Sequence, residues 1–197
     1  MFKLITSAVL LISCFVIAGA QATTAPPLKI EFEYKLLATK RVTTMEIEMK
    51  EAAAAGYRFL EVASGPTAFG GAEALIVMVR ERNGDQKQRF EYKLLATSRT
   101  STMQKELQEA GDAGFEHRGQ SIFHKTFGSE VIVILEREID AKPKLWEYKL
   151  LATSKTSTMQ KEVMEAAEAG YQFVGFSSGS TFFGGGEVVT IMRRPRE

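Results

Sequence analysis

The heptapeptide Glu-Tyr-Lys-Leu-Leu-Ala-Thr occurs three times in this chain of 197 residues, at positions 33–39, 91–97 and 147–153. Each copy directly follows an aromatic residue, which is Phe32, Phe90 or Trp146, and the spacing between copies is nearly constant. A fixed internal period marks a repeated supersecondary unit that stacks on its neighbours. The sequence therefore predicts three tandem modules, at residues 32–82, 90–138 and 146–195.

Each module is expected to start with a strand and to continue into a helix. The heptapeptide alternates side chains between two faces, as a strand does. In the second module, Met103, Leu107 and Ala110 then recur at the spacing of one helix face. A glycine in the position of a left-handed helix cap follows at Gly56, Gly114 and Gly170. Capping boxes are expected to start the helices, with the pairs Thr43 and Glu46, Ser101 and Gln104, Ser157 and Gln160.

Two further strands are expected after each helix, joined by a glycine-containing turn. The last strand of each module is a nearly continuous apolar run, for example residues 131–135, and such runs suit the middle of a sheet. We therefore expect the strand order first–third–second, with the helix across one face. The fold class is α+β: three tandem β-α-β-β modules, each a three-stranded, mainly antiparallel sheet with one helix on a face.

A module of about 50 residues is marginally stable alone, so the modules are expected to bury apolar faces against each other. Alternation places Tyr34, Leu36 and Ala38 on one strand face, which we assign to the module's own helix. Leu37 lies on the opposite face and is expected to contact another sheet or another chain. We expect the modules to pack with pseudo-threefold symmetry, and modules joined by flexible linkers are the alternative.

The first 22 residues are typical of a secretory signal peptide. One cation, Lys3, precedes an apolar stretch, and Ala20-Gln21-Ala22 resembles a cleavage site. Residues 23–31 then read as a linker. The expected location is periplasmic or secreted, without a membrane span once the leader is removed. The alternative is a lipid anchor on Cys14, because residues 11–14 resemble a lipobox.

Composition excludes several function classes. The formal net charge of +1 falls to zero without the leader, since Lys3 is its only charged residue. A neutral chain without a basic run is a poor match for nucleic acid. Cys14 is the only cysteine, so the mature chain forms no internal disulfide.

The repeated motifs resemble a bacterial family of domains of unknown function, number 4177. The resemblance rests on the heptapeptide, a Thr-Met or Ser-Thr-Met helix start, a glycine–aromatic helix end, and a last strand that ends in arginine. It covers all three modules, although the tryptophan often found after the helix glycine is here Tyr57, Phe115 or Tyr171. The resemblance implies a small α+β domain, often an oligomer-former, with no established activity and no catalytic residues to carry over.

The sequence contains no recognisable catalytic or cofactor constellation. No Gly-x-Ser-x-Gly elbow or phosphate-binding glycine loop occurs. His117 and His124 lack metal-ligand spacing, and we interpret them as surface or turn residues. The Phe-Gly segments at 69–71, 127–129 and 183–185 are interpreted as hairpin turns, with a phenylalanine-tipped binding loop as the alternative. We therefore expect a protein that is not an enzyme and holds no metal or cofactor.

The loop between the first strand and the helix is the best candidate for a ligand site. Hydroxyl groups, one cation and free helix N–H groups converge there, which is the arrangement that holds a small anion. Plain helix capping is the alternative. The candidate anion-binding residues are Arg41, Thr43, Arg99, Ser101, Thr102, Lys155, Ser157 and Thr158.

The expected function is protein interaction or assembly in the bacterial envelope, by self-association or with an unidentified protein. Binding of a small anion or metabolite at the three strand-to-helix loops is the alternative function.

Overall fold

The computed structural model describes residues 31–66, 72–124, 129–180 and 186–196, and the side chains of Pro66, Ala72, His124 and Ser180 are not described. The expected signal peptide (1–22), the lipid-anchor candidate Cys14 and residues 23–30 of the expected linker therefore lie outside the described residues. The Phe-Gly segments lie outside them as well, except for Ser129.

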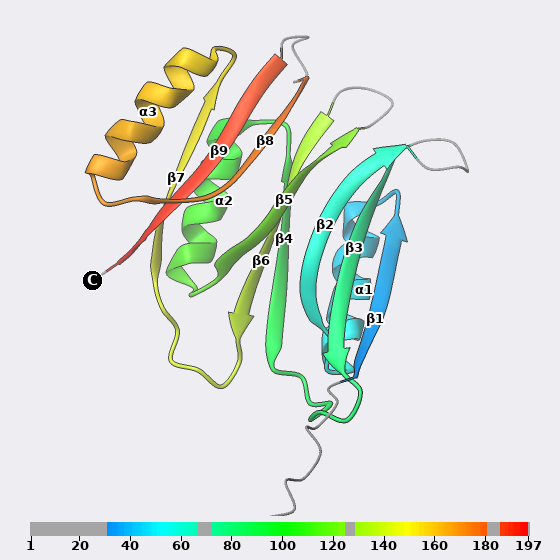
Figure 1. Ribbon diagram of the computed structural model, residues 1–197. Helices are drawn as coiled ribbons and strands as arrows, with labels where there is room; N and C mark the ends of the chain where they lie inside the picture. The colour runs from blue at the N-terminus through cyan, green and yellow to red at the C-terminus, as the bar shows by residue number, and fades with distance from the viewer. Residues whose placement is uncertain (1–30, 67–71, 125–128, 181–185, 197) are drawn as a thin grey trace, which may run out of the picture.

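Each repeat folds into the expected β-α-β-β module (Figure 1). Module 1 contains β1 (Phe32–Thr39), α1 (Val42–Ala54), β2 (Arg58–Pro66) and β3 (Ala72–Glu81). Module 2 contains β4 (Phe90–Thr97), α2 (Thr100–Asp112), β5 (Glu116–His124) and β6 (Ser129–Glu138). Module 3 contains β7 (Trp146–Thr153), α3 (Thr156–Glu168), β8 (Gln172–Ser180) and β9 (Gly186–Pro195).

The strand order in the three sheets is β1-β3-β2, β4-β6-β5 and β7-β9-β8, and all pairings are antiparallel. The expected first–third–second order is thus confirmed. The apolar third strand lies in the centre, where both of its edges are hydrogen-bonded. In the middle module it is also buried on both faces, over Ile132 to Glu136, because modules 1 and 3 flank it.

The helix ends match the sequence pattern at one terminus and differ from it at the other. Gly56 has φ 82° and follows the last helical turn, where the N–H of Tyr57 bonds to the carbonyl of Ala52. This is the expected left-handed cap, and it recurs at Gly114 and Gly170. The capping-box prediction was wrong, because the helices start two residues earlier, after N-cap residues Arg41, Arg99 and Lys155 that make no side-chain cap bond.

The glutamate of the repeated heptapeptide takes part in a set of polar contacts that joins the first strand, the central strand and the helix end of each module. The Glu33 carboxylate is 2.7 Å from the guanidinium of Arg80 on the central strand. Arg80 also donates to the carbonyl of Ala55 at the helix end, at 2.8 Å, and stacks on the Tyr57 ring. The same set recurs as Glu91–Arg137–Ala113–Phe115 and Glu147–Arg194–Ala169–Tyr171. The glutamate of the heptapeptide and the arginine at the strand end therefore have a structural role.

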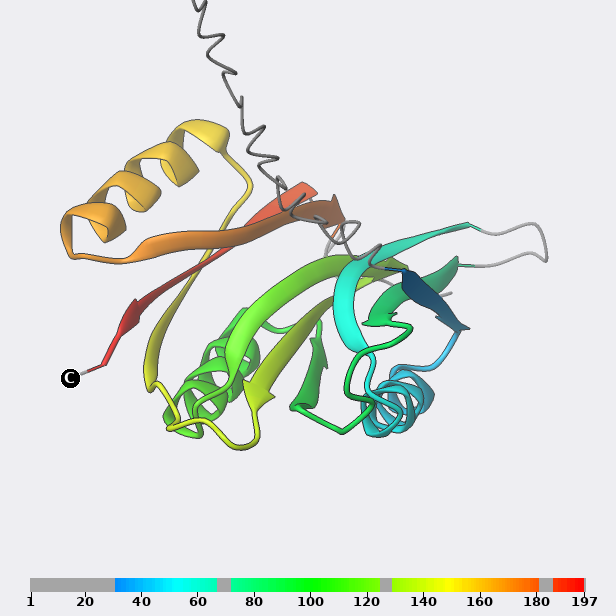
Figure 2. The same cartoon turned by 60° about the horizontal axis from the view of Figure 1, so that its bottom comes forward.

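The modules follow one another in an open array, with module 2 between the other two (Figures 1 and 2). Helix α1 packs against β4 and helix α2 against β7, so each of these helices also covers the first strand of the next module. Strand β5 lies between β2 and β8. The hydrophobic clusters cross the module boundaries: one joins Met45 and Met49 to Tyr92, and another joins Leu107 to Tyr148. The structure therefore shows modules that pack against one another, and not modules joined only by flexible linkers.

The assignment of strand faces was wrong. Leu37 packs in the same cluster as Met45 and Met49 of its own helix, and Leu95 does the same in module 2. The face with the tyrosine instead meets the preceding module. The physical reason is that the tyrosine-bearing face carries more apolar residues, and at the boundary Tyr92 and Leu94 are buried in a cluster with Phe59 of module 1.

The expected pseudo-threefold arrangement requires three equivalent interfaces, and two are formed within the chain. Closure would place α3 against β1. Tyr34 on β1 is 63% exposed, whereas its equivalents Tyr92 and Tyr148 are 1% and 3% exposed. The array therefore ends in two faces that are not joined to each other. Of the helices in the described ranges, none combines the length and apolar character needed to cross a membrane.

Candidate functional site

The interface between consecutive modules is built around the tyrosine of the heptapeptide. The hydroxyl oxygen of Tyr92 accepts a hydrogen bond from the backbone N–H of Phe59, at 2.8 Å, and the hydroxyl donates to the Glu136 carboxylate at 2.8 Å. Tyr148 repeats the first bond, accepting from the N–H of His117 at 2.7 Å. Burial raises the pKa of Tyr148 to about 12, and burial together with Glu136 raises the pKa of Tyr92. Both hydroxyls therefore remain protonated donors.

An ion pair crosses each boundary, and its charges are reversed from one boundary to the next. Between modules 1 and 2, Arg58 on β2 lies 2.8 Å from Glu136 on β6. Between modules 2 and 3, Glu116 on β5 lies 2.6 Å from Arg193 on β9. Arg58 and Glu116 occupy equivalent positions, as do Glu136 and Arg193. A wrong pairing of modules would bring like charges together, so the reversal favours the observed order.

Two glutamines of α2 cover the outer edge of β7. The Gln104 amide accepts from the N–H of Leu150 at 2.7 Å and donates to the carbonyl of Tyr148 at 2.9 Å. Gln108 repeats this one turn later, accepting from the N–H of Tyr148 and donating to the carbonyl of Trp146. These amides take the place of a neighbouring strand. Gln104 was expected to cap its own helix, and it serves the next module instead.

Glycines set how closely the modules approach. A Cβ at Gly119 would lie 2.9 Å from the Phe59 ring, and one at Gly175 would lie 2.8 Å from the Gln120 side chain. A Cβ at Gly111 on α2 would lie 2.4 Å from the backbone oxygen of Trp146. Any larger residue at these positions would force the second strands, or the helix and β7, apart.

His117 is a buried interface residue, so its interpretation as a surface or turn residue was wrong. Its side chain is 6% exposed between β5 and β8, with Nε2 3.2 Å from Gln120 Oε1. Burial lowers the pKa of His117 to about 4, and the nearby Arg193 and Arg118 act in the same direction. The residue occupies the position of Phe59 and Phe173 in the other modules, which a single-module pattern could have indicated as a core position.

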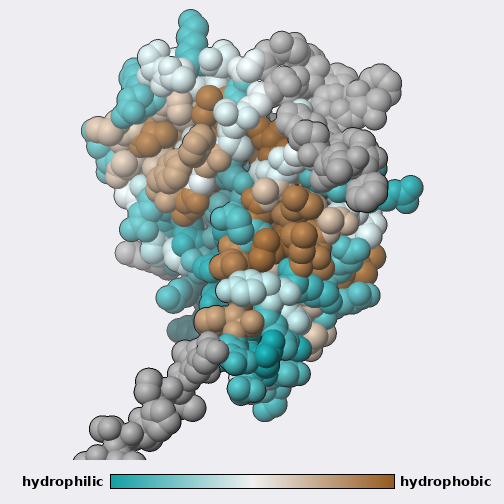
Figure 3. All heavy atoms as spheres, turned by 45° about the vertical axis from the view of Figure 1, so that its right-hand side comes forward, coloured by the Kyte–Doolittle hydropathy of each residue, from teal (hydrophilic) through white to brown (hydrophobic). Residues whose placement is uncertain are grey.

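The two ends of the array expose apolar residues, including Tyr34 and Phe173, whose equivalents Tyr92 and His117 are buried at the internal boundaries. We call the module 1 end the head, formed by Phe32, Tyr34, Leu36 and Leu60, all of which are exposed. We call the module 3 end the tail, formed by the exposed residues Met164, Phe173 and Phe176. Figure 3, with the module 1 side turned forward, shows hydrophobic side chains gathered on that side. Adjacent exposed apolar residues of this kind mark interaction surfaces.

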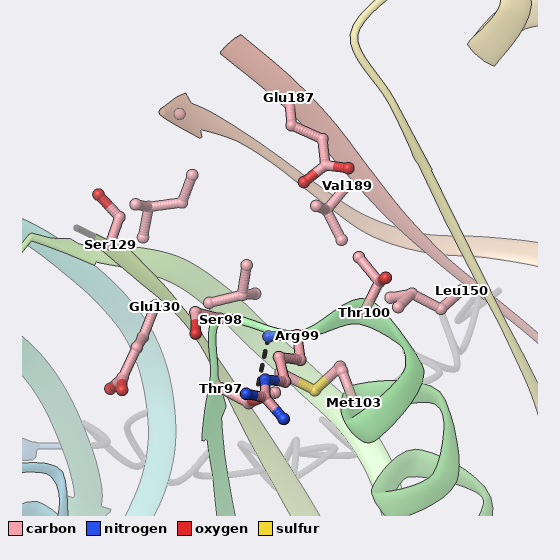
Figure 4. Close-up of a pocket in the computed structure, with 13 residues that line it drawn as sticks. Thr97, Ser98, Arg99, Thr100, Met103, Ser129, Glu130, Leu150, Glu187 and Val189 are labelled. Atoms are coloured by element: carbon pink, nitrogen blue, oxygen red, sulfur yellow. Dashed lines mark hydrogen bonds between the residues drawn. The ribbon is translucent and has the colours of Figure 1, made fainter. Parts of the chain in front are cut away.

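The predicted anion-binding residues lie where the loop after each first strand enters the helix: the cations Arg41, Arg99 and Lys155 are the N-cap residues, and the hydroxyl residues lie in the first helical turn. In each loop the threonine of the heptapeptide accepts the backbone N–H of the cationic residue, for example Thr97 Oγ1 from Arg99 at 3.1 Å. Arg99 lines a pocket of about 30 Å³ with Glu130 and Glu187 (Figure 4). Ser101 and Thr102 do not line this pocket.

The other two loops differ in their surroundings. Arg41 and Thr43 line a groove that also contains Glu46 and Glu106. Carboxylates beside the cation oppose an anion at the first and second loops. In the third loop, Lys155 and Ser157 are exposed and Thr158 is partly exposed. Anion binding at these loops stays a prediction.

Within the described residues, no group of three or more histidine, cysteine, aspartate or glutamate side chains is arranged to hold a metal ion. No protein-family model, curated protein or solved structure matches the chain. The resemblance to family 4177 therefore stays a prediction.

Proposed function

We propose that the chain is an exported, non-enzymatic assembly protein of the bacterial envelope, which binds protein partners through the head and the tail. One observation carries the proposal: Tyr34 is 63% exposed, while the same tyrosine is 1% and 3% exposed in modules 2 and 3. A residue that twice forms the centre of an interface is thus available a third time. When a partner covers exposed apolar residues of this kind, the burial of their surface favours binding.

The composition of the tail supports the same proposal. Phe173, Phe176 and Met164 stand where module 2 has His117, Gln120 and Gln108. Terminal units of repeat arrays normally carry a polar outer face, because that face meets water. Here the terminal unit is more apolar than the internal one at three equivalent positions. A surface of this composition fits a bound partner.

Site-specific photo-crosslinking in the exporting bacterium tests whether the ends bind protein. A benzophenone amino acid would replace Tyr34 in one strain and Phe173 in another, with Ile139 as the control. Ile139 is an exposed apolar residue in the linker between modules 2 and 3, away from both ends. We expect covalent protein adducts from at least one end and none from Ile139. Adducts from neither end would refute the proposal.

The mass of the protein purified from its host tests export. Cleavage after Ala22 predicts a chain that begins at Thr23, whereas lipidation predicts a lipid-modified chain that begins at Cys14. An intact chain starting at Met1, found in the cytoplasmic fraction, would contradict export.

A further inference from the structure

We propose that the partner of each end is a second copy of this chain, joined head to tail by a third use of the internal interface. The inference rests on the proposed function, and it goes further by naming the occupant and the contacts. In this arrangement α3 and β8 of one copy cover β1 and β2 of the next. The head and the tail are the two unused halves of an interface that the chain forms twice, so the same kind of contact can continue from one copy to the next.

The tyrosine contact defines the register. Tyr92 and Tyr148 accept the N–H of Phe59 and His117, which begin the irregular step in β2 and β5. Phe173 begins the same irregular step in β8. Among the described residues, no tyrosine hydroxyl is bonded to its N–H. Tyr34 of a second copy is the residue that the repeat assigns to it.

The helix contact has its parallel in the boundary between modules 2 and 3, since at the first boundary the equivalent residue of α1 is Glu46, which is paired with Lys50. Gln160 on α3 is the equivalent of Gln104, and it is exposed, with no hydrogen-bond partner in the described part of the chain. Gln104 bonds to the carbonyl of Tyr148 and the N–H of Leu150. The equivalent groups on β1 belong to Tyr34 and Leu36. Strand β1, like β7, is the edge of its sheet, so the equivalence with Tyr148 and Leu150 places these groups on the side that faces away from β3.

The charges at the boundary permit this union. The internal ion pairs occupy two equivalent positions, held by Arg58 and Glu136 and then by Glu116 and Arg193. At a head-to-tail junction the same two positions would hold Gln172 and Val79. Neither residue is charged, so no like-charge repulsion opposes the contact. A junction without an ion pair also differs from both internal boundaries, which keeps the module order within each chain distinct.

Glu61 limits how tightly the ends can join. It stands at the position of Gly119 and Gly175, where a Cβ would contact the preceding module at less than 3 Å. Its carboxylate is bonded to the backbone N–H of Val62, at 2.9 Å, and the residue is exposed. A second copy must displace this side chain in order to approach as closely as the internal modules do. We therefore infer a reversible association that weakens with dilution, and a glycine at position 61 should strengthen it.

Sedimentation velocity of the protein, purified as its host processes it, tests the proposal over about 1 to 100 µM. We expect the mean mass to rise with concentration. Tyr34→Asp places a charge in the head, and Phe176→Asp places one in the tail. Each variant has one end that can no longer bind, so each alone should remain a monomer. An equimolar mixture of the two should form dimers, because one variant keeps its tail and the other keeps its head. Both residues are exposed in the single chain, and unchanged thermal unfolding would show that the variants fold.

Two further variants make the test specific. Glu61→Gly should lower the dissociation constant by about tenfold or more, since it removes a carboxylate and a Cβ from the junction. Ile139→Asp adds the same charge away from both ends and should associate as the original chain does. Association unaffected by both end substitutions, or a mixture that stays monomeric, would overturn head-to-tail union.

The outcomes separate this inference from the proposed function. A chain that stays monomeric at all concentrations, yet forms photo-adducts with a different protein from Tyr34 or Phe173, overturns self-assembly and leaves the proposed function standing. A monomeric chain without photo-adducts overturns both.

Discussion

Tyr92 and Phe59 are joined across the boundary of modules 1 and 2 by a hydrogen bond of 2.8 Å, from the backbone N–H of Phe59 to the tyrosine hydroxyl oxygen. The bond recurs between Tyr148 and His117 at the next boundary. A heptapeptide repeated three times thus supplies two internal joints and one unused copy, Tyr34. This relationship links the repeat in the sequence to the open ends of the fold.

Removal of the Tyr92 hydroxyl should destabilise the chain. Tyr92→Phe leaves the N–H of Phe59 without its partner in a buried site and takes a donor from Glu136. We expect a loss of about 1–3 kcal/mol in the free energy of unfolding, measured by denaturant titration. Tyr34→Phe is the matched control and should change the monomer by less than about 0.5 kcal/mol. Equal losses at the two positions would show that the internal joint has no special role.

The reversed ion pairs predict a rescue by charge exchange. Glu136→Arg alone adds a cation to Arg58 and Arg118 in a site where the carboxylate is 5% exposed, and we expect a loss of about 3–5 kcal/mol. Arg58→Glu combined with Glu136→Arg recreates the order of charges that Glu116 and Arg193 have. The double variant should recover at least half of the loss. Additive losses in this double-mutant cycle would mean that the two residues are not coupled.

The glutamines that cover β7 should matter only where a strand lies beside them. Gln104→Ala leaves the N–H of Leu150 and the carbonyl of Tyr148 without partners in a partly buried site, which should cost about 1–3 kcal/mol. Gln160→Ala removes the equivalent side chain from the exposed face of α3. In the monomer it should have an effect of less than about 0.5 kcal/mol. The free energy of unfolding of the two variants should be measured by denaturant titration at a concentration where the chain is a monomer. Equal losses in the two variants would contradict the role of Gln104 at β7.

Burial of His117 predicts a specific loss of stability in acid. The unfolded chain binds a proton with a pKa near 6.5, while the pKa of the folded state is about 4. Because the unfolded state binds more protons between these values, stability falls as the pH drops from about 6.5 to about 4. The slope reaches about 1.4 kcal/mol per pH unit.

His117→Phe, which copies the residue of modules 1 and 3, should remove this component. Arginine and tyrosine partners also lower the pKa of Glu33 and Glu147, and these carboxylates contribute their own loss at lower pH in both proteins. The difference between the two unfolding curves therefore isolates the histidine. Parallel pH profiles for the original chain and the variant would show that His117 is not buried as a neutral group.

The order of elements could be predicted from sequence, because it depends on local signals. The apolar run at 131–135 indicated a central strand, and Gly56, Gly114 and Gly170 adopt the left-handed conformation their position required. These signals are contained within one module. The helix start was harder to place, because the hydroxyl residues near it lie in the first turn and Thr39, two residues before the N-cap, makes the turn contact instead.

The contacts between modules could not be read from one repeat. The apolar face with Tyr92 was assigned to its own helix, since an isolated module would bury its most apolar face there. The chain uses that face at the boundary between modules. On the other face of β4, Leu95 packs against Met103 and Leu107 of the module's own helix. Likewise, the backbone groups that bind Gln104 and the tyrosine hydroxyl that binds the His117 N–H belong to module 3, so these contacts are not visible in the pattern of one module. The candidate interaction surfaces follow only from knowing which copy lacks a neighbour.

Hydrogen exchange at the backbone N–H groups of Phe59, His117 and Phe173, resolved by NMR, tests whether Tyr34 of a second copy forms the third tyrosine contact. We expect strong protection of Phe59 and His117 at all concentrations, since tyrosine hydroxyls accept their N–H groups within the chain. The N–H of Phe173 should exchange fast in dilute protein, and more slowly as the concentration rises and a second copy supplies Tyr34. Equal protection of all three groups in dilute protein, or fast exchange of Phe173 at every concentration, would contradict this third contact.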